Sequence, residues 1–530
     1  MTQRRPSRGR CAAALVLVLA ACAPTPPAAP APEPVKRVRI VHTNDFHGRL
    51  LPQRPSWAAG RPVGGSAVLA AHFDSAAARF DGPTFVLSAG DDMQGTAISN
   101  LSWGRATIAA HNAAGYAAAA LGNHEFDWGL DTLRARMAES RFPWVAANVY
   151  AAGTQRQPEW LRPWTLLERG GVRVAVVGAA LPNTPQMVMA GRVVGLDFGP
   201  VGPAVDRSAR EARAAGADFV VVTMHVGAEC QDPGAGAPAE QESTGCEGEL
   251  LEAVEQITEP VDLVVGGHTH NRVLTTVKGI PVAEAASYST AYSVTDLERR
   301  GGRTAVVHRA VRTPWADEVS PDTAVARVVG EWEARVRPVS ERVLVSFAAA
   351  MEREGSEYPL GNLVADAVRA QTGARVSLVN TGSVRRAMPA GPITYGMLYE
   401  LQPFQNELVR VSATGAQLRA ALENALSRDA APDAHVSGMT VTYSPTAPRG
   451  SRVREVRLAD GRALRDADTV TIGTSEFVAT GGDRYEVLKQ ARMTRTGVVD
   501  LDALVAYLRS LPQPVQPPAT GRWRTAGNRE

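Results

Sequence analysis

Five short apolar runs in this chain each lead into polar residues of the kind that bind metal ions. The runs are 38–42, 85–88, 117–121, 219–224 and 263–265, and each has the length and composition of a buried β-strand. The polar residues that follow them are Asp45, His47, Asp91, Asn123, His225, His268 and His270. Ligands in an open α/β sheet gather at the carboxyl ends of parallel strands, so these side chains are expected to meet in one crevice.

The seven polar residues together indicate a metal site more strongly than any one of them does alone. A single histidine after a strand is usually a hydrogen-bonded core or loop residue. The chain has only 10 histidines, however, and half of them fall in these five segments. Glycine flanks the polar residues in four segments and lets the backbone approach an ion closely. The pattern predicts two cations held by mixed oxygen and nitrogen donors.

The first 22 residues predict a targeting segment. Four arginines among the first ten residues precede the apolar stretch 12–21, and residues 19–22, Leu-Ala-Ala-Cys, have the spacing of a bacterial lipobox. About ten apolar residues are too few to span roughly 30 Å of hydrocarbon, which disfavours a transmembrane anchor. A cleaved secretion signal is the remaining alternative. The favoured prediction is an exported bacterial lipoprotein with lipid on Cys22, anchored in the membrane and facing the periplasm or the cell surface.

Residues 23–36 are rich in alanine and proline, which predicts either an extended tether or an inconsequential tail. The remaining chain of about 500 residues is too long for one core, so two or three domains are expected. The net charge is +2, and no basic cluster is interleaved with aromatic residues. These features disfavour a nucleic-acid polymer as partner, and no protein partner can be read from the sequence.

The cysteines left after export predict a disulfide. The chain has four cysteines, of which Cys230 and Cys246 lie beyond the leader and bracket a loop rich in glycine and proline. An even pair in an exported protein favours a disulfide. A metal-binding pair is the weaker alternative, because the C-x-x-C spacing is absent. Closing a loop of roughly 15 residues stabilises by about 3 kcal/mol in the chain-entropy model.

Strand-like runs alternate with amphipathic helical stretches from residue 38 to about 313, which predicts an α/β domain. The later runs 282–285, 292–297 and 304–309 predict shorter antiparallel strands. The predicted boundaries are 1–22 for the leader, 23–36 for the tether, 37–315 for the first domain, 316–342 for a linker helix, 343–511 for a second domain and 512–530 for a disordered tail.

The ordered motifs D-x-H, G-D, G-N-H-E, H and G-H-x-H resemble those of the calcineurin-like metallophosphoesterases. The longer forms T-N-D-F-H-G at 43–48 and G-N-H-E-F-D-W-G at 122–129 resemble the 5′-nucleotidase family, which includes bacterial periplasmic hydrolases of UDP-sugars and nucleotides. The resemblance spans residues 38–511. It implies an α/β fold in which a four-layer α/β/β/α sandwich precedes a smaller α/β domain that determines substrate specificity.

The resemblance also implies a ligand set for two divalent ions. One ion would be bound by Asp45, His47 and His270, the other by Asn123, His225 and His268, and both by Asp91. A hydroxide shared between the ions would attack the phosphorus. Well-studied nucleotidases often carry an amide at the position of His270, although other branches have histidine there. Zinc, manganese, iron and cobalt all suit such a site.

His124 and Asp127 resemble the catalytic pair of the family. Asp127 follows three residues later, close enough to hold the imidazole in one tautomer and to favour its protonated form. His124 would then stabilise the transition state or protonate the leaving oxygen. The alternative is that Asp127 only caps the following helix.

Two segments of the second domain resemble substrate-binding motifs. Residues 380–385, from Asn380 to Arg385, resemble N-G-G-G-I-R, whose arginine binds the substrate beside the metals. Arginine suits phosphate through its planar donor fork. Residues 477–483 resemble F-x-x-x-G-G-D, which implies that Phe477 stacks on a nucleobase and Asp483 contacts the nucleoside. Arg353 is a further candidate, and Arg386 and Arg410 are weaker ones; each has a surface role as its alternative.

The family's second base-stacking aromatic residue is missing from its usual place before the V-S-G segment at 436–438. His435 stands near that place with a spacing that differs by about two residues, and Phe404 is expected to pack near the pocket without stacking on the base. Losing one stacking face weakens the case for a nucleotide but leaves phosphoester hydrolysis intact.

Three functions fit the sequence. The first is a phosphohydrolase acting on nucleoside monophosphates, with UDP-sugars and cyclic nucleotides as other substrates. The second applies the same metal chemistry to a different phosphoester or to a sulfur-chain conjugate. The third is a surface receptor or adhesin without turnover, against which the intact ligand set and the His124–Asp127 pair both argue.

Overall fold

The computed structural model describes residues 1–3, 35–189, 191–231, 239–427 and 430–526. The predicted leader, its lipid acceptor Cys22 and nearly all of the tether lie outside these residues. The last tether residue, Lys36, already belongs to the first strand. Among the described residues, every helix is too short or too polar to cross a membrane.

The N-terminal region is built on two six-stranded sheets. The first has the order β16-β15-β1-β2-β3-β4, with bounds Arg303–Arg312, Tyr292–Arg300, Lys36–Thr43, Thr84–Ser88, Tyr116–Ala120 and Trp144–Val145. The second has the order β13-β14-β12-β9-β7-β6, with bounds Arg272–Val277, Ile280–Ala285, Leu263–Gly266, Phe219–Met224, Val172–Ala179 and Trp164–Arg169. The second sheet has a parallel centre and two antiparallel edges, whereas the first is antiparallel only at its β16-β15-β1 side and parallel from β1 to β4.

Alternate side chains of these strands point into two different cores. In β7, Val174 and Val176 face the first sheet, where they pack with Ile40 and Leu87. Ala175 and Val177 of the same strand face a core shared with helices α6 (Val201–Ala214) and α7 (Glu249–Gln256). A strand buried on both faces must be apolar throughout, which explains why these runs lack the alternating pattern of a half-exposed strand.

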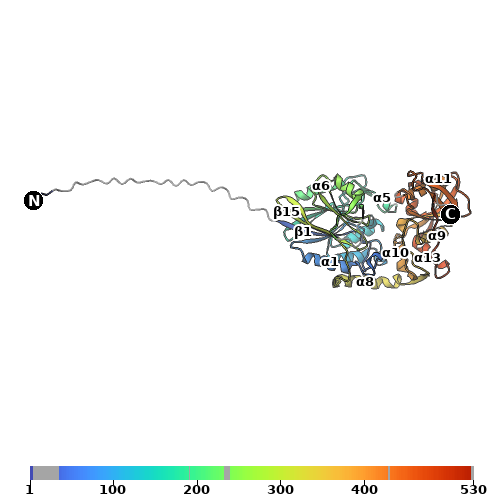
Figure 1. The fold of residues 1–530 in the computed structure, drawn as a ribbon, viewed down its shortest axis with the longest axis horizontal. Coiled ribbons are helices and arrows are strands. Elements are labelled where there is room, and N and C mark those ends of the chain that lie inside the picture. The colour runs from blue at the N-terminus through green and yellow to red at the C-terminus, as the bar shows by residue number, and fades with distance from the viewer. Residues whose placement is uncertain (4–34, 190, 232–238, 428–429, 527–530) are drawn as a thin grey trace. The chain divides into compact units, whose positions relative to one another are not determined.

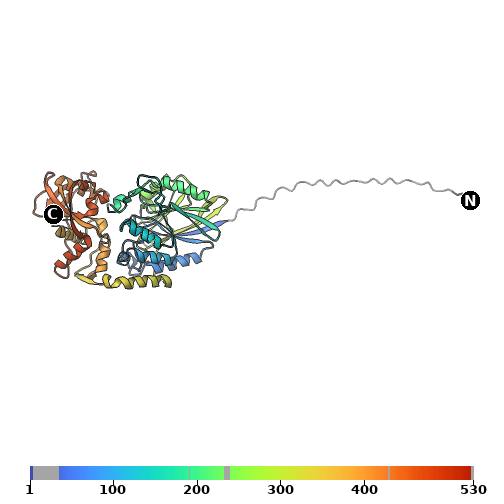
Figure 2. The ribbon, with the colours of Figure 1, turned by 180° about the vertical axis from the view of Figure 1, so that it is seen from behind.

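The outer face of the first sheet is covered by helices α1 (Ser66–Ala78), α3 (Arg105–Ala114), α4 (Leu130–Glu139) and α8 (Thr323–Ser340). Figure 1 shows α1 and α8 on one side of the paired sheets and α6 on the other, and the reverse view in Figure 2 shows the same layers. This arrangement confirms the predicted α/β/β/α class.

One strand pairs differently from the prediction. Residues 282–285, expected to lie in an antiparallel strand, belong to β14, which runs antiparallel to β13 but parallel to β12. Parallel strands are usually connected by a helix. Here the chain returns from β12 to the parallel strand β14 through β13, which forms a hairpin with β14.

The C-terminal region follows α8 and contains a mixed sheet with the order β21-β18-β24-β20-β25. Their bounds are Ala434–Ser437, Val376–Asn380, Thr469–Ser475, Glu407–Thr414 and Arg492–Val499. One face packs with α9 (Pro359–Thr372) and α13 (Asp500–Ser510), and the other with α11 (Gly415–Ala425). The smaller sheets are β17-β19 (Val343–Phe347, Gly391–Thr394) and β23-β22-β26 (Val453–Leu458, Met439–Tyr443, Trp523–Thr525).

The segment after residue 511 corrects the prediction of a disordered tail. Val515 pairs with Phe347, and Trp523 to Thr525 form β26 beside β22. The Trp523 side chain is 7% exposed, and its Nε1 donates to the carbonyl of Ala434 at 2.9 Å. Proline-rich composition suggested disorder, but one buried tryptophan and the bidentate pair between Arg522 and Asp366 anchor the segment.

Two short strands beside the second sheet carry the predicted disulfide. Strands β10 (Glu229–Gln231) and β11 (Thr244–Glu247) pair with each other, and a disulfide joins Cys230 to Cys246. The strand β10 begins four residues after His225, so the cross-link braces the chain next to a predicted metal ligand.

The buried tail predicts a stability effect. A chain ending at Leu511 should lose at least about 3 kcal/mol of unfolding free energy, because it leaves an apolar cavity where Trp523 packs. Urea unfolding followed by circular dichroism would measure this loss. A chain ending at Ala526 is the matched control and should unfold at the urea concentration of the full chain. Equal midpoints for all three chains would contradict the anchoring role of the tail.

Candidate active site

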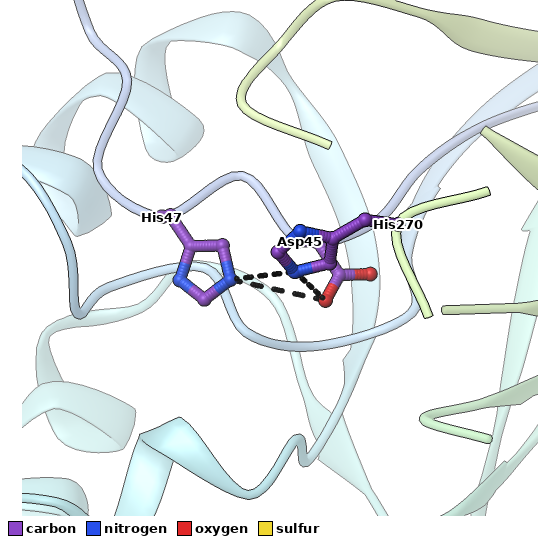
Figure 3. A group of neighbouring side chains, drawn as sticks. All are labelled: Asp45, His47 and His270. Atoms are coloured by element: carbon purple, nitrogen blue, oxygen red, sulfur yellow. Dashed lines mark hydrogen bonds and ion pairs between the residues drawn. The ribbon is translucent and has the colours of Figure 1, made fainter. Parts of the chain in front are cut away.

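Loops at the ends of β1 and β12 bring three predicted ligands together. Figure 3 shows the carboxylate of Asp45 and the imidazoles of His47 and His270 turned toward one another. Their ligand atoms are mutually close: Nε2 of His47 lies 3.2 Å from Nε2 of His270 and 3.9 Å from Oδ1 of Asp45. Oδ1 of Asp45 lies 3.2 Å from Nε2 of His270.

A second group forms beside the first from β2, β3, β9 and β12. Oδ2 of Asp91 lies 3.0 Å from Nε2 of His225. Oδ1 of Asn123 lies 3.1 Å from both Nε2 of His225 and Nδ1 of His268. The ligand atoms of Asp91, His225 and His268 all lie within 4.8 Å of one another. Oδ2 of Asp91 is also 4.0 Å from Nε2 of His47, so this carboxylate faces both groups.

The donor set fits two divalent cations. Nitrogen and oxygen donors about 2.0–2.2 Å from one ion stand roughly 3.0–3.6 Å apart, close to the spacing in both groups. Nδ1 of His47 donates to the carbonyl of Gln94 at 2.7 Å, and Nδ1 of His225 donates to that of Ala89 at 2.8 Å. These bonds fix the tautomer in which Nε2 of each ring presents its lone pair to the site.

Burial and the carboxylates of Asp45 and Asp91 determine the pKa values of the histidines in the site. Burial lowers the pKa of His268 to about 3 and that of His47 well below its ordinary value, so both rings are in the neutral form that binds metals. Burial acts in the same direction on His225, but the adjacent Asp91 carboxylate overcomes it and raises the pKa of His225 to about 10. A metal ion bound by His225 must displace that proton.

The ligand loops adopt an unusual backbone. The residues with positive φ include five of the seven predicted ligands: Asp45 (48°), His47 (49°), Asp91 (56°), His268 (87°) and His270 (62°). Such conformations are uncommon outside glycine and concentrate at functional sites. Each left-handed residue reverses the chain locally, which turns Asp45 and His47 toward one ligand group and directs His268 and His270 to different groups.

Two buried glutamates hold these loops without reaching the ligand atoms. The carboxylate of Glu125 accepts N–H bonds from Asp91, Asp92 and Gly122, each at 2.8 Å. Glu284 similarly joins the chain after β9 to the chain after β12. It accepts from N–H of Ala228, from the hydroxyl of Thr269 and from N–H of Asn271, at 2.8–3.2 Å.

Sequence reasoning missed both glutamates as functional residues. Glu125 belongs to the G-N-H-E motif, so its position held a usable signal. Glu284 lies in the apolar run of β14, where a fully buried acid is itself informative, since an unpaired carboxylate rarely stays inside a protein core.

His124 stands at the mouth of the site with Asp127 beside it. Nδ1 of His124 is 2.8 Å from Oδ2 of Asp127 across the short 3₁₀ turn His124–Phe126. Burial alone would lower the pKa of His124, but the carboxylates of Asp127 and Asp91 raise it above its ordinary value. The ring of Phe404 stacks on His124 at 5.4 Å between centroids. The carboxylate therefore binds the imidazole, as the catalytic interpretation expects, while its role in turnover remains a prediction.

A cavity of about 540 Å³ opens from the second ligand group toward the C-terminal region. Its walls include eleven of the predicted site residues: Asp91, Asn123, His124, Asp127, His268, His270, Arg353, Asn380, Arg385, Phe477 and Asp483. The remaining ligands, Asp45, His47 and His225, lie fully buried beneath it. The predicted metal ligands and the predicted substrate contacts thus border one continuous space.

The C-terminal wall carries the predicted substrate contacts. Phe477 lies directly against Gly482, where a Cβ would fall 2.4 Å from its Cε2 atom. Nδ2 of Asn380 donates to Oδ2 of Asp483 at 2.6 Å, so these two residues form one polar group beside the ring. Arg353 is exposed at the rim. Arg385 lies over Phe404, with its guanidinium carbon 5.7 Å from the ring centroid.

Three weaker expectations are corrected by the structure. His435 is fully buried, 4.3 Å from the ring of Tyr358, and does not line the cavity, so it cannot replace the missing base-stacking residue. Arg386 pairs with Glu400 outside the cavity. Arg410 is exposed on β20, away from the cavity wall.

The cavity also contains residues that no motif indicated. From the N-terminal region, Asn183 and residues 186–189 reach it, around the short helix α5 (Thr184–Met187). From the C-terminal region come Asn424, Asp433 and Tyr485. Asn424 lies in α11, residues 186 and 187 lie in α5, and the others lie in loops, so only their spatial convergence identifies them.

Family models match both regions of the chain. Residues 38–272 match the calcineurin-like phosphoesterase model, and residues 330–490 match the model of the 5′-nucleotidase C-terminal domain. A 5′-nucleotidase precursor from Thermus thermophilus has a similar structure, with a TM-score of 0.80 and 27% identity, covering 93% of this chain and all of that one.

Two curated relatives show different degrees of coverage. Endonuclease YhcR of Bacillus subtilis is 27% identical over 514 residues, which cover 92% of this chain but only 41% of that protein. The chain therefore spans less than half the length of this relative. Protein UshA of Salmonella pullorum is 24% identical over 527 residues, covering 89% of this chain and 91% of UshA.

The position of Asp91 between the two ligand groups predicts that Asp91→Ala disrupts both metal content and turnover. The substitution removes the one carboxylate that faces both groups, so the purified protein should lose at least one of two bound ions. Elemental analysis after metal loading would measure the loss. Asp197→Ala, in the exposed middle of strand β8 (Leu196–Phe198), is the control and should retain both ions. Full metal content in Asp91→Ala would refute its bridging assignment.

Proposed function

The chain belongs to the 5′-nucleotidase family of metallophosphoesterases, and we propose that it hydrolyses nucleoside 5′-monophosphates by metal-dependent attack of water at phosphorus. The observation that carries the proposal is the meeting of seven ligand side chains and the His124–Asp127 pair at one cavity. We further propose that the first domain spans 37–315, that a linker helix follows it, and that the second domain begins at 343 and extends beyond 511 to include β26.

We assign one ion to Asp45, His47 and His270, another to Asn123, His225 and His268, and the bridging position to Asp91. Two divalent ions held there would polarise the phosphoryl oxygens and lower the pKa of a water molecule. Zinc, manganese, iron and cobalt all suit these donors.

Side chains of the protein then act on the leaving group and on the phosphate of the substrate. His124 in its protonated form transfers a proton to the leaving oxygen, and Asp127 supports that form by holding Nδ1. Arg385 binds the phosphate oxygens through its planar donors. Since Phe404 stacks on His124 and lies under Arg385, it keeps both groups at the cavity mouth without contacting the base.

The residues of the C-terminal region that line the cavity would recognise the leaving group. We propose that Phe477 stacks on one face of a nucleobase, while Asp483 and Asn380 contact the nucleoside and Arg353 contacts it at the rim. UDP-sugars and cyclic nucleotides would use the same wall.

A second candidate is supported by the missing aromatic residue. His435 is buried away from the cavity, so its segment offers no second stacking face. A different phosphoester, or a sulfur-chain conjugate, would need no such clamp. A binding protein without turnover is the least supported alternative, since all seven predicted ligands come together and His124 lies beside Asp127.

We propose that the protein works outside the cytoplasm as a lipoprotein anchored through Cys22, in the periplasm or at the cell surface. The disulfide between Cys230 and Cys246 supports an oxidising compartment. Its partners would be the small-molecule substrate and the membrane that holds the lipid.

A screen of the purified mature protein tests the proposed function. Nucleoside monophosphates, sugar nucleotides, cyclic nucleotides and simple phosphate esters would each be offered with zinc, manganese, iron or cobalt, and released phosphate measured. The expected result is metal-dependent hydrolysis with preference for a nucleotide. Preference for a simple ester would favour the second candidate, and absence of turnover with every ester and metal would refute phosphohydrolysis.

His124→Ala should retain both ions but turn over about 10²–10⁴-fold more slowly, the usual scale of acid–base assistance. Kinetics and elemental analysis on one sample would check both statements. His308→Ala, on the outer strand β16, is the matched control and should keep the unaltered rate. Loss of ions from His124→Ala would show that His124 is a ligand instead.

Phe477→Ala should weaken nucleotide binding more than chemistry. One lost stacking face is worth about 1–3 kcal/mol, which raises KM roughly 5- to 150-fold for a nucleoside monophosphate. An aryl phosphate has no base to stack, so its hydrolysis should remain nearly unchanged in the same protein. An equal loss with both substrates would mean that Phe477 is a structural residue.

A further inference from the structure

The antiparallel edge of the first sheet holds a cavity of about 490 Å³, which we call the edge cavity. Strands β15 and β16 supply Tyr292 and Arg312, which stand opposite each other in the ladder and so lie on the same face of the sheet. Helix α1 supplies His72 and, at its C-cap, Arg79. Among the residues that the structure describes, the edge cavity and the active-site cavity have no lining residue in common. Its volume is within the range of small-molecule sites.

The base of the edge cavity is polar although it is buried. His72 and Tyr292 are only 9% and 5% exposed. Nε2 of His72 donates to the carbonyl of Trp315 at 3.1 Å, so Nδ1 of the neutral ring is left as an acceptor. The Tyr292 hydroxyl lies 3.5 Å from that Nδ1, which is too far for a strong hydrogen bond. The hydroxyl therefore remains free to donate to a better acceptor in the cavity.

Positive charge exceeds negative charge on the walls of the edge cavity. The charged residues that line it are Arg39, Arg79, Arg272, Arg312 and Glu318. Two of the arginines are already engaged: Arg39 holds both oxygens of Asp296, at 2.6 and 2.7 Å, and Arg272 donates to a backbone carbonyl at 2.9 Å. The single lining carboxylate, Glu318, lies 3.1 Å from Nη2 of Arg61, which balances its charge.

The other two arginines have donors to offer. Arg79 donates to the hydroxyl of Ser75 at 2.7 Å, and no carboxylate in the described part of the chain pairs with it. Arg312 lies 3.2 Å from Glu240 in an exposed pair of the kind that contributes little stability. Burial raises the pKa of Tyr292, and the charges of Arg312 and Arg79 oppose that effect, as expected for guanidinium groups that face the same cavity.

We propose that the edge cavity binds the phosphate group of a small molecule through Arg79, Arg312 and the hydroxyl of Tyr292. The planar donor forks of two arginines suit the oxygens of a phosphate. The hydroxyl adds a donor from the buried base, where the low dielectric constant strengthens a hydrogen bond to an anion. This site lies outside the active-site cavity and does not rest on the proposed function.

Calorimetric titration of the metal-loaded protein tests the proposal, with inorganic phosphate and phenylphosphonate as probes. The unaltered protein should bind phosphate at a site that the double variant Arg79→Gln/Arg312→Gln weakens at least about 10-fold, the scale of lost hydrogen bonds to a charged group. Tyr292→Phe should weaken the same site without any change of net charge. All variants should retain the metal content and the p-nitrophenyl phosphate kcat of the unaltered protein.

The matched control is Arg156→Gln/Arg303→Gln, which removes the same charge from exposed positions of the N-terminal region outside the edge cavity. It should leave every phosphate site unchanged. Tighter binding of phenylphosphonate than of phosphate at the edge cavity would identify a phosphate ester as the ligand, and the reverse order would identify free phosphate.

The proposal is overturned if Arg79→Gln/Arg312→Gln binds phosphate with the same number of sites and the same affinities as the unaltered protein. An equal weakening by the control pair would also overturn it, because the effect would then come from net charge alone. A protein that hydrolyses no phosphate ester would refute the proposed function but would leave this comparison of binding intact.

Discussion

The metal centre depends on backbone reversals that ordinary residues resist. In an extended strand, side chains two positions apart stand about 6.6 Å apart along the chain, which is too far for easy sharing of one ion. The left-handed turns at Asp45 and His47 bring their ligand atoms to 3.9 Å, and those at His268 and His270 turn one ring toward each ligand group. A non-glycine residue in this conformation costs roughly 1–2 kcal/mol, so other contacts must hold it.

Those contacts come from polar side chains buried behind the ligands. Glu125 collects N–H groups from the loops after β2 and β3, and Glu284 does the same for the loops after β9 and β12. Asn44 adds a third brace by donating to Asp45 and accepting from N–H of Ala285. The ligands are thus fixed before any ion arrives, which reduces the ordering cost of binding.

Sequence patterns predicted the parts of the site that follow directly from chain order. A strand followed by D-x-H or G-H-x-H has a local signature, and the His124–Asp127 pair is only three residues apart. Glu284 has no comparable signature, because its partners include a segment far away in the sequence. The prediction for the segment after residue 511 was wrong for a different reason. The composition of this segment indicated disorder, but Trp523 is buried in the core of the C-terminal region.

The close approach of the loops after β2 and β3 has a consequence for reading related sequences. A Cβ at Gly122 would lie 2.1 Å from Oδ1 of Asp91, and one at Gly90 would lie 2.6 Å from the backbone nitrogen of Gly122. Even alanine at Gly122 would displace the carboxylate that faces both ligand groups. A relative that keeps every ligand but replaces this glycine must therefore hold the equivalent carboxylate in a different position.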